Sequence, residues 1–122
     1  MGGINPYGHR FGGALADDLA GGGGAAGQQG GIDVAGPHEM LAYRFNNIKG
    51  DEAHFPLLWL RRAIGRGTGG AGRQSGGAGL SSAVKLHGAP LLHGVLMGHS
   101  LAMPSTPGIH GGMPAATVGL RI

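Results

Sequence analysis

The chain has 122 residues, including 29 glycines and no cysteine, and a formal charge of +3 at pH 7. The absence of cysteine excludes disulfides, thiolate zinc sites and cysteine nucleophiles, and nine scattered Lys and Arg residues do not form the basic face that nucleic-acid binding requires. Glycine adds no side chain to a core, so the chain is a poor candidate for a self-sufficient domain. Because charged residues make up only 12%, the composition predicts that its surface is covered by further parts of the same polypeptide or by partner subunits.

The N-terminal part, residues 1–36, is predicted to be a glycine-rich segment with one short helix. Glycine and proline in residues 1–10 predict no regular structure there. Apolar residues at intervals of four predict the helix at about 11–20. Residues 21–31 carry seven glycines without periodicity, which predicts a loop and, on composition alone, disorder.

The remainder, residues 37–122, is predicted to be β-rich. The apolar run after Pro56 is predicted to be a strand, with a helical turn as the alternative. Asn46-Asn47, after the strand predicted at 39–45, are residues typical of a turn. The segments on either side of Pro90 are expected to form a hairpin or neighbouring antiparallel strands, and residues 103–113 a loop. The strands are predicted at 39–45, 57–64, 80–87, 91–97 and 116–122. The fold class expected is therefore mainly β, with one short helix and long glycine-rich loops.

A glycine loop from Gly65 to Gly79 lies at the centre of this arrangement. Two clusters of the form Gly-Gly-Ala-Gly repeat at a seven-residue spacing around Arg73. Glycine permits close backbone approach and positive φ, so the regular doublets predict a shaped structural loop rather than a flexible linker. Its candidate structural residues are Gly69, Gly70, Gly72, Arg73, Gly76, Gly77 and Gly79.

Several other residues have a chemical and a plain structural interpretation. Gly67–Gly72 matches a phosphate-loop pattern, but the residues after it cannot sustain the helix that a phosphate loop needs. His54 beside Asp51 and Glu52 is either an acid–base cluster or a solvated turn. Arg61-Arg62 either meets a carboxylate or phosphate or is an exposed pair. Further candidates are the evenly spaced His87, His93 and His99, as a metal trio or as surface histidines, and Trp59 as a core anchor.

These segments resemble the late region of hydantoinase B/oxoprolinase-type subunits, over about Leu15 to Ile122. The matching pieces occur in the family's order: Leu19–Ala25 with Gly31-Ile32-Asp33, Phe55-Pro56-Leu57-Leu58, Arg61-Arg62, Thr68–Arg73, Gly76–Gly79 and Gly111-Gly112-Met113-Pro114. Gly67-Thr68 stands in place of the family's Asp-Ser pair, and Ser75 in place of a bulky or basic residue. The family's Gly-Gly-x-His-x-x-Asp metal motif has no counterpart, so we expect a fragment of a larger α+β subunit, truncated at both ends.

The resemblance implies ATP-dependent hydrolysis of a cyclic amide C–N bond, of the hydantoin or 5-oxoproline class. It implies a hydantoinase A-like subunit or domain as partner in a hetero-oligomer, and ATP and a divalent metal for the full complex but none bound by this fragment, which alone is expected to be inactive. No catalytic residue is assigned. The alternatives are a ketone carboxylase subunit of the acetone or acetophenone type, a non-catalytic glycine-rich interaction segment, or a small nucleotide-binding protein.

The expected location is the cytoplasm, without membrane contact. The longest apolar runs, near 55–60 and 91–97, are too short to cross a bilayer. The first residues show no basic segment followed by an apolar core, as a secretory signal would.

Overall fold

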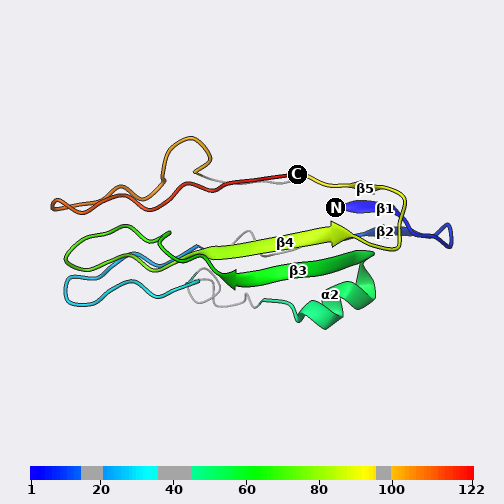
Figure 1. Ribbon diagram of the computed structural model, residues 1–122, viewed down its shortest axis with the longest axis horizontal. Helices are drawn as coiled ribbons and strands as arrows, with labels where there is room; N and C mark the ends of the chain where they lie inside the picture. The colour runs from blue at the N-terminus through cyan, green and yellow to red at the C-terminus, as the bar shows by residue number, and fades with distance from the viewer. Residues whose placement is uncertain (15–20, 36–44, 96–99) are drawn as a thin grey trace.

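The computed structural model describes residues 1–14, 21–35, 45–95 and 100–122. Within these ranges the chain is mainly β, with two small sheets and one short helix, as predicted. The sheets and the helix lie toward one end of Figure 1, and long extended segments without strand pairing run toward the other. The elements are β1 (Gly2–Ile4), β2 (Arg10–Gly12), α2 (Ile48–His54), β3 (Leu57–Ile64), β4 (Leu80–Leu86) and β5 (Leu92–His93).

The longest strands, β3 and β4, form an antiparallel pair joined by the glycine loop. They confirm the strands predicted at 57–64 and 80–87. The second sheet has the order β2-β1-β5, with both neighbours of β1 antiparallel to it. The predicted hairpin around Pro90 is therefore wrong, because β4 pairs with β3 and β5 pairs with β1.

Residues 1–10 also depart from the prediction, since they contain β1 and the start of β2. Asn5 closes the turn between the two strands: its side-chain oxygen accepts the N–H groups of Tyr7 and His9 at 3.0 and 2.9 Å. Gly8 supplies a φ of +81°. Gly8, one of the residues that predicted irregular structure, therefore helps to build a hairpin turn together with Asn5.

The predicted helix at 11–20 does not begin where expected, because Phe11 belongs to β2. Residues 15–20 of that helix, and most of the strand predicted at 39–45, lie outside the described residues. The helix α2 forms instead where turn chemistry was predicted. The side chain of Asn47 caps it by accepting the N–H of Lys49 at 2.9 Å, so the turn signal was a helix start.

The predicted strand at 116–122 is absent, although the loop expected at 103–113 contains neither helix nor strand. The N–H of Ala116 donates to Thr68 at 2.9 Å, and that of Val118 donates to Ser100 at 3.0 Å. Because successive donors reach two different segments, no ladder develops along either of them.

The extended glycine-rich segments contact one another backbone to backbone. The N–H of Gly77 donates to Gly23 at 2.9 Å, and that of Gly31 donates to Ser75 at 2.8 Å. A Cβ atom on Gly77 would overlap the carbonyl of Ile32. These contacts require glycine because no side chain fits between the backbones, as at the axis of a collagen triple helix.

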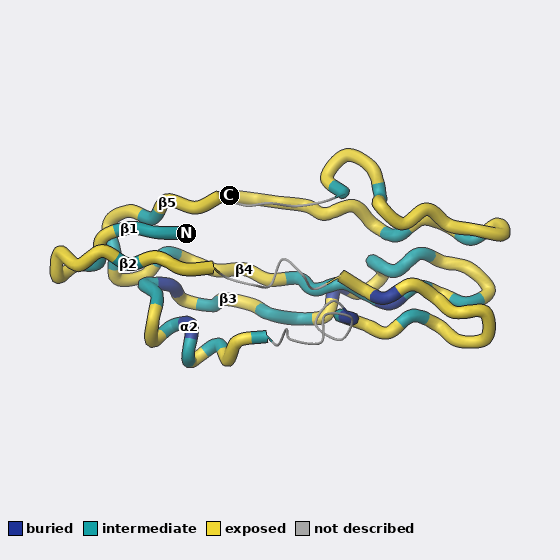
Figure 2. The backbone as a smooth tube through the Cα atoms, turned by 180° about the vertical axis from the view of Figure 1, so that it is seen from behind, coloured by how far each residue is buried: buried dark blue, intermediate teal, exposed yellow. Residues whose placement is uncertain are grey.

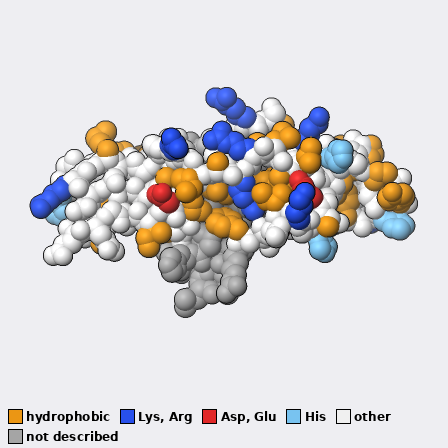
Figure 3. Space-filling model, turned by 60° about the horizontal axis from the view of Figure 1, so that its bottom comes forward, with side chains coloured by type: hydrophobic (Ala, Val, Ile, Leu, Met, Phe, Trp, Pro, Cys, Tyr) orange, Lys and Arg blue, Asp and Glu red, His pale blue; other side chains and the backbone are white. Residues whose placement is uncertain are grey.

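Side-chain burial is slight in this arrangement. Ala35 and Leu57 are the buried hydrophobic residues among those described, and Figure 2 shows only short buried stretches. Hydrophobic side chains remain on the surface, where Figure 3 shows them interspersed with Lys and Arg side chains. The described residues include no helix that is long and apolar enough to cross a membrane.

Replacing Gly77 by alanine tests the backbone packing. We expect Gly77→Ala to lower the free energy of unfolding by about 1–3 kcal/mol or more, because the new methyl group overlaps the Ile32 backbone. Gly24→Ala is the matched control: its Cβ position is open and its φ lies outside the left-handed region, so a small gain of about 0.4–1 kcal/mol is expected. Urea denaturation followed by fluorescence of Trp59 measures both, and equal effects would contradict the packing argument.

Candidate functional site

A bulge in β3 determines which side chains face the helix α2. The register passes from Trp59 opposite Val84 to Arg61 opposite Ala83, which leaves Leu60 as the extra residue. Trp59 and Arg62, three apart in sequence, therefore occupy alternate pleat positions on the same face. Without the bulge, the Arg62 side chain would lie on the opposite face of the sheet.

Arg62 joins the sheet to the helix through several contacts. Its guanidinium carbon lies 4.4 Å from the centroid of the Trp59 ring and 5.4 Å from that of Phe45. It donates to the carbonyl of Asn46 at 2.8 Å and lies 4.0 Å from the carboxylate of Asp51. Arg62 is thus not the exposed strand-end residue of the plain interpretation, whereas Arg61 is exposed.

Asp51 is the buried charged residue of the described chain, with 4% of its surface exposed. Removing a carboxylate from water is costly unless a cation compensates it, and the guanidinium of Arg62 is placed to do so. The burial follows from the position of Asp51 on the inner side of α2, facing β3. The burial of Asp51 does not fit the solvated-turn interpretation of this cluster, whereas the exposure of His54 does.

Glu52, the neighbouring carboxylate, satisfies a backbone group at the edge of β3. Its Oε1 accepts the N–H of Trp59 at 2.9 Å, and its Oε2 lies 3.9 Å from the ammonium of Lys49, which is 90% exposed. This bond ties α2 to the strand across the tight connection at Pro56. The indole N–H of Trp59 is buried without a hydrogen-bond partner in the described structure, and the residue as a whole is half-buried.

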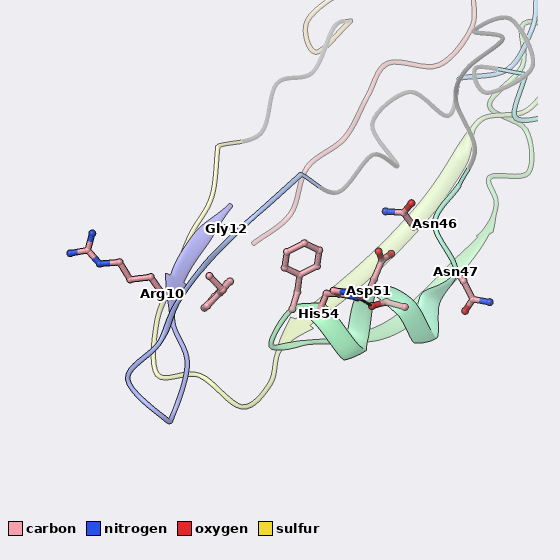
Figure 4. Close-up of a pocket in the computed structure, with 9 residues that line it drawn as sticks. Arg10, Gly12, Asn46, Asn47, Asp51 and His54 are labelled. Atoms are coloured by element: carbon pink, nitrogen blue, oxygen red, sulfur yellow. Dashed lines mark hydrogen bonds between the residues drawn. The ribbon is translucent and has the colours of Figure 1, made fainter.

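A pocket of about 560 Å³ opens between β2 and α2. Figure 4 shows Asp51 and His54 together on the helix side, while the Arg10 side chain on β2 extends away from them. Polar and aromatic groups thus share one concave surface. The lining residues are Arg10, Phe11, Gly12, Asn46, Asn47, Gly50, Asp51, His54 and Phe55.

His54 has one ring nitrogen committed and one available. Its Nδ1 lies 2.7 Å from the carbonyl oxygen of Gly50. Because a carbonyl only accepts, Nδ1 carries the proton of this bond, and in the neutral imidazole Nε2 keeps a free lone pair. His54, which is exposed, lines the same pocket as Asp51, whose carboxylate lies 4.0 Å from Arg62, so the acid–base cluster considered from the sequence stays a prediction.

The glycine loop lies away from this pocket and has different surroundings. A Cβ atom on Gly69 would overlap the Gly76 carbonyl, and one on Gly70 would overlap the Met113 carbonyl. Gly72, Arg73 and Gly76 also lie in this loop, and Arg73 is exposed. At the base of the loop, the Thr68 hydroxyl donates to Gly65 and accepts the N–H of Gly79, at 2.7 and 2.8 Å.

The histidine trio is not assembled as a metal site in the described chain. His87 and His93 are exposed, and His99 lies outside the described residues. No cluster of three or more His, Asp or Glu residues that could hold a metal ion occurs within the described ranges. The described carboxylates are engaged elsewhere: Asp33 accepts the N–H of Ala78 at 2.7 Å, and Asp51 and Glu52 have the contacts given above.

The sequence comparison identifies the protein class. The family model for hydantoinase B/oxoprolinase matches residues 1–121, and the chain belongs to this family. The match covers essentially the whole chain and extends the resemblance to the N-terminal hairpin. No curated protein sequence matches the chain.

Glu52→Ala tests the link between α2 and β3. We expect a loss of about 1.5 kcal/mol in unfolding free energy, because the N–H of Trp59 loses a charged acceptor. Lys49→Ala removes the other partner of Glu52, an exposed i,i+3 contact, and should cost less than about 0.5 kcal/mol. Chemical denaturation compares the variants, and similar losses for both would assign the effect to the Lys49 pair instead.

Proposed function

We propose that this chain forms part of a hydantoinase B-type subunit that hydrolyses a cyclic amide C–N bond, of the hydantoin or 5-oxoproline class, in an ATP-dependent reaction. The observation that carries the proposal is the family match over residues 1–121. A hydantoinase A-like subunit or domain is the proposed partner, and it would supply the nucleotide chemistry.

The pocket between β2 and α2 is the proposed place where this chain meets the substrate. Ring opening needs a group that moves a proton to or from the amide nitrogen or the attacking water. His54 is suited to that role because its Nδ1–H bond to Gly50 leaves Nε2 free to accept a proton. Phe11 and Phe55 supply the apolar walls that small-molecule sites generally have.

Asp51 is proposed to position the pocket. The carboxylate is buried and faces Arg62, so it orients the guanidinium and keeps α2 against β3. The donor set of the described residues does not fit a divalent metal, because each described carboxylate already has a backbone or guanidinium partner. Metal and ATP are therefore assigned to the full complex, and no step of this proposal passes through them.

The test uses the polypeptide that carries these residues, co-expressed with a hydantoinase A-like protein. We expect ATP-dependent ring opening of hydantoin or 5-oxoproline, and a fall in kcat of roughly 100-fold or more for His54→Gln. His87→Gln, at an exposed histidine outside the pocket, is the control and should leave kcat unchanged. ATP- and bicarbonate-dependent consumption of a ketone would indicate the carboxylase alternative. Equal rates for the two histidine variants would remove His54 from the mechanism.

A further inference from the structure

Among the described residues, the outer edge of β4 carries a row of unpaired backbone groups. Flanking hydrogen bonds establish which groups point outward: the N–H of His87 donates to Pro56 at 2.9 Å, and that of Gly65 donates to Gly79 at 2.7 Å. Antiparallel pairs alternate between hydrogen-bonded and non-hydrogen-bonded, so the odd-numbered residues of β4 bond to β3. The even-numbered residues direct their N–H and C=O groups away from β3; they are Leu80, Ser82, Val84 and Leu86.

The backbone groups at neighbouring edge positions have hydrogen-bond partners, unlike the outward groups of these four residues. At Ala78, just before β4, the N–H donates to Asp33 and the carbonyl accepts from Val34, both at 2.7 Å. On the far edge of the sheet, Glu52 accepts the N–H of Trp59. Within the described chain, β4 has hydrogen-bond partners only through β3, and its residues from Ser82 to Lys85 are exposed.

We propose that β4 pairs antiparallel with β4 of a second copy of this chain, forming a continuous sheet of the order β3-β4-β4-β3. A seven-residue strand with one unpaired edge in the described chain is a template for strand addition, and a two-fold axis at Ala83 makes this edge self-complementary. Each Ser82 then bonds to Val84 of the second copy, and each Leu80 to Leu86. All the outward groups of β4 find partners in this register.

Side chains and charge fit the same register. Lys85 lies opposite Ser81 of the second copy, so the two lysines are separated along the strands and no like charges face each other. Leu80 packs beside Leu86, and Val84, which is 43% exposed in the single chain, gains Ser82 of the second copy as a cross-strand neighbour. In this register Gly88 of the second copy comes opposite Ala78, and the chain turns there, with φ +78°, so that strand pairing ends where Asp33 and Val34 bond to Ala78.

Cysteine cross-linking in the cysteine-free chain tests this register. In the proposed dimer, Ala83 and its copy form a non-hydrogen-bonded pair with Cα atoms about 4.5 Å apart, within the roughly 4.4–6.8 Å that a disulfide spans. Ala83→Cys is therefore expected to give a disulfide-linked dimer under mild oxidation by dissolved oxygen. Ser81→Cys, on the same face but roughly 14 Å from its copy, should remain uncross-linked.

Sedimentation of the cysteine-free chain measures the dimer directly. Ala83→Glu places two carboxylates opposite each other at the axis and should raise the dissociation constant of the dimer about fivefold or more. Within each chain the new carboxylate lies opposite Arg61, a cross-strand pair of opposite charge, so the fold of the monomer should be kept. Ala63→Glu puts the same charge on the same face, one strand further from the axis, and should leave the dimer intact. A monomer at all concentrations, or equal cross-linking of both cysteine variants, would overturn the proposal, and a one-to-one complex with a hydantoinase A-like protein through β4 would replace it.

Discussion

Contact between glycine backbones is the constraint on which this structure depends. The glycine-rich segments at 21–35 and 65–79 approach so closely that a single methyl group at Gly77 would meet the backbone of Ile32. This approach allows amide groups to bond between segments that form no regular sheet. The same loop returns the chain at Gly79 beside Gly65, which sets the register of the β3–β4 pair.

This way of packing determines what the rest of the chain can do. Each backbone hydrogen bond contributes only about 1 kcal/mol net, and ordering each glycine costs more entropy than ordering any other residue. With Ala35 and Leu57 as its buried hydrophobic residues, the described chain has little apolar burial to offset that cost. Surfaces that a conventional core would cover, including the outer edge of β4, remain available for association with other polypeptide.

The sequence predicted those elements for which the flanking residues and the apolar pattern both indicate a strand. The strands β3 and β4 are apolar segments that begin after Pro56 and after Gly79, and both were found. The pairing of the second sheet was less predictable: β5, at residues 92–93, pairs with β1, at residues 2–4, through two residue pairs. The helix α2 was missed because the asparagine that begins a turn also caps a helix, and only the residues packed against it decide between the two.

The candidate site was partly visible in the sequence. His54 and Asp51 lie three apart, so an acid–base pair could be considered before the helix was known. The role of Arg62 could not be predicted, because the two-residue period of a strand places its side chain on the other face of the sheet from Trp59. Only the bulge at Leu60 brings both side chains to the same face. Arg10 belongs to the pocket through the fold of a distant hairpin, for which the local sequence carries no signal.

Family identity and the proposed reaction depend on different residues in this chain. The glycines through which the family resemblance is recognised make backbone contacts, and a glycine without a side chain can neither transfer a proton nor distinguish one substrate from another. The groups proposed to act chemically lie around α2, held by a bulge, a buried carboxylate and a capped helix. In the proposed function, a change of substrate would therefore require changes at positions such as Arg10, Phe11 and His54, while the glycine segments that define the fold stay as they are.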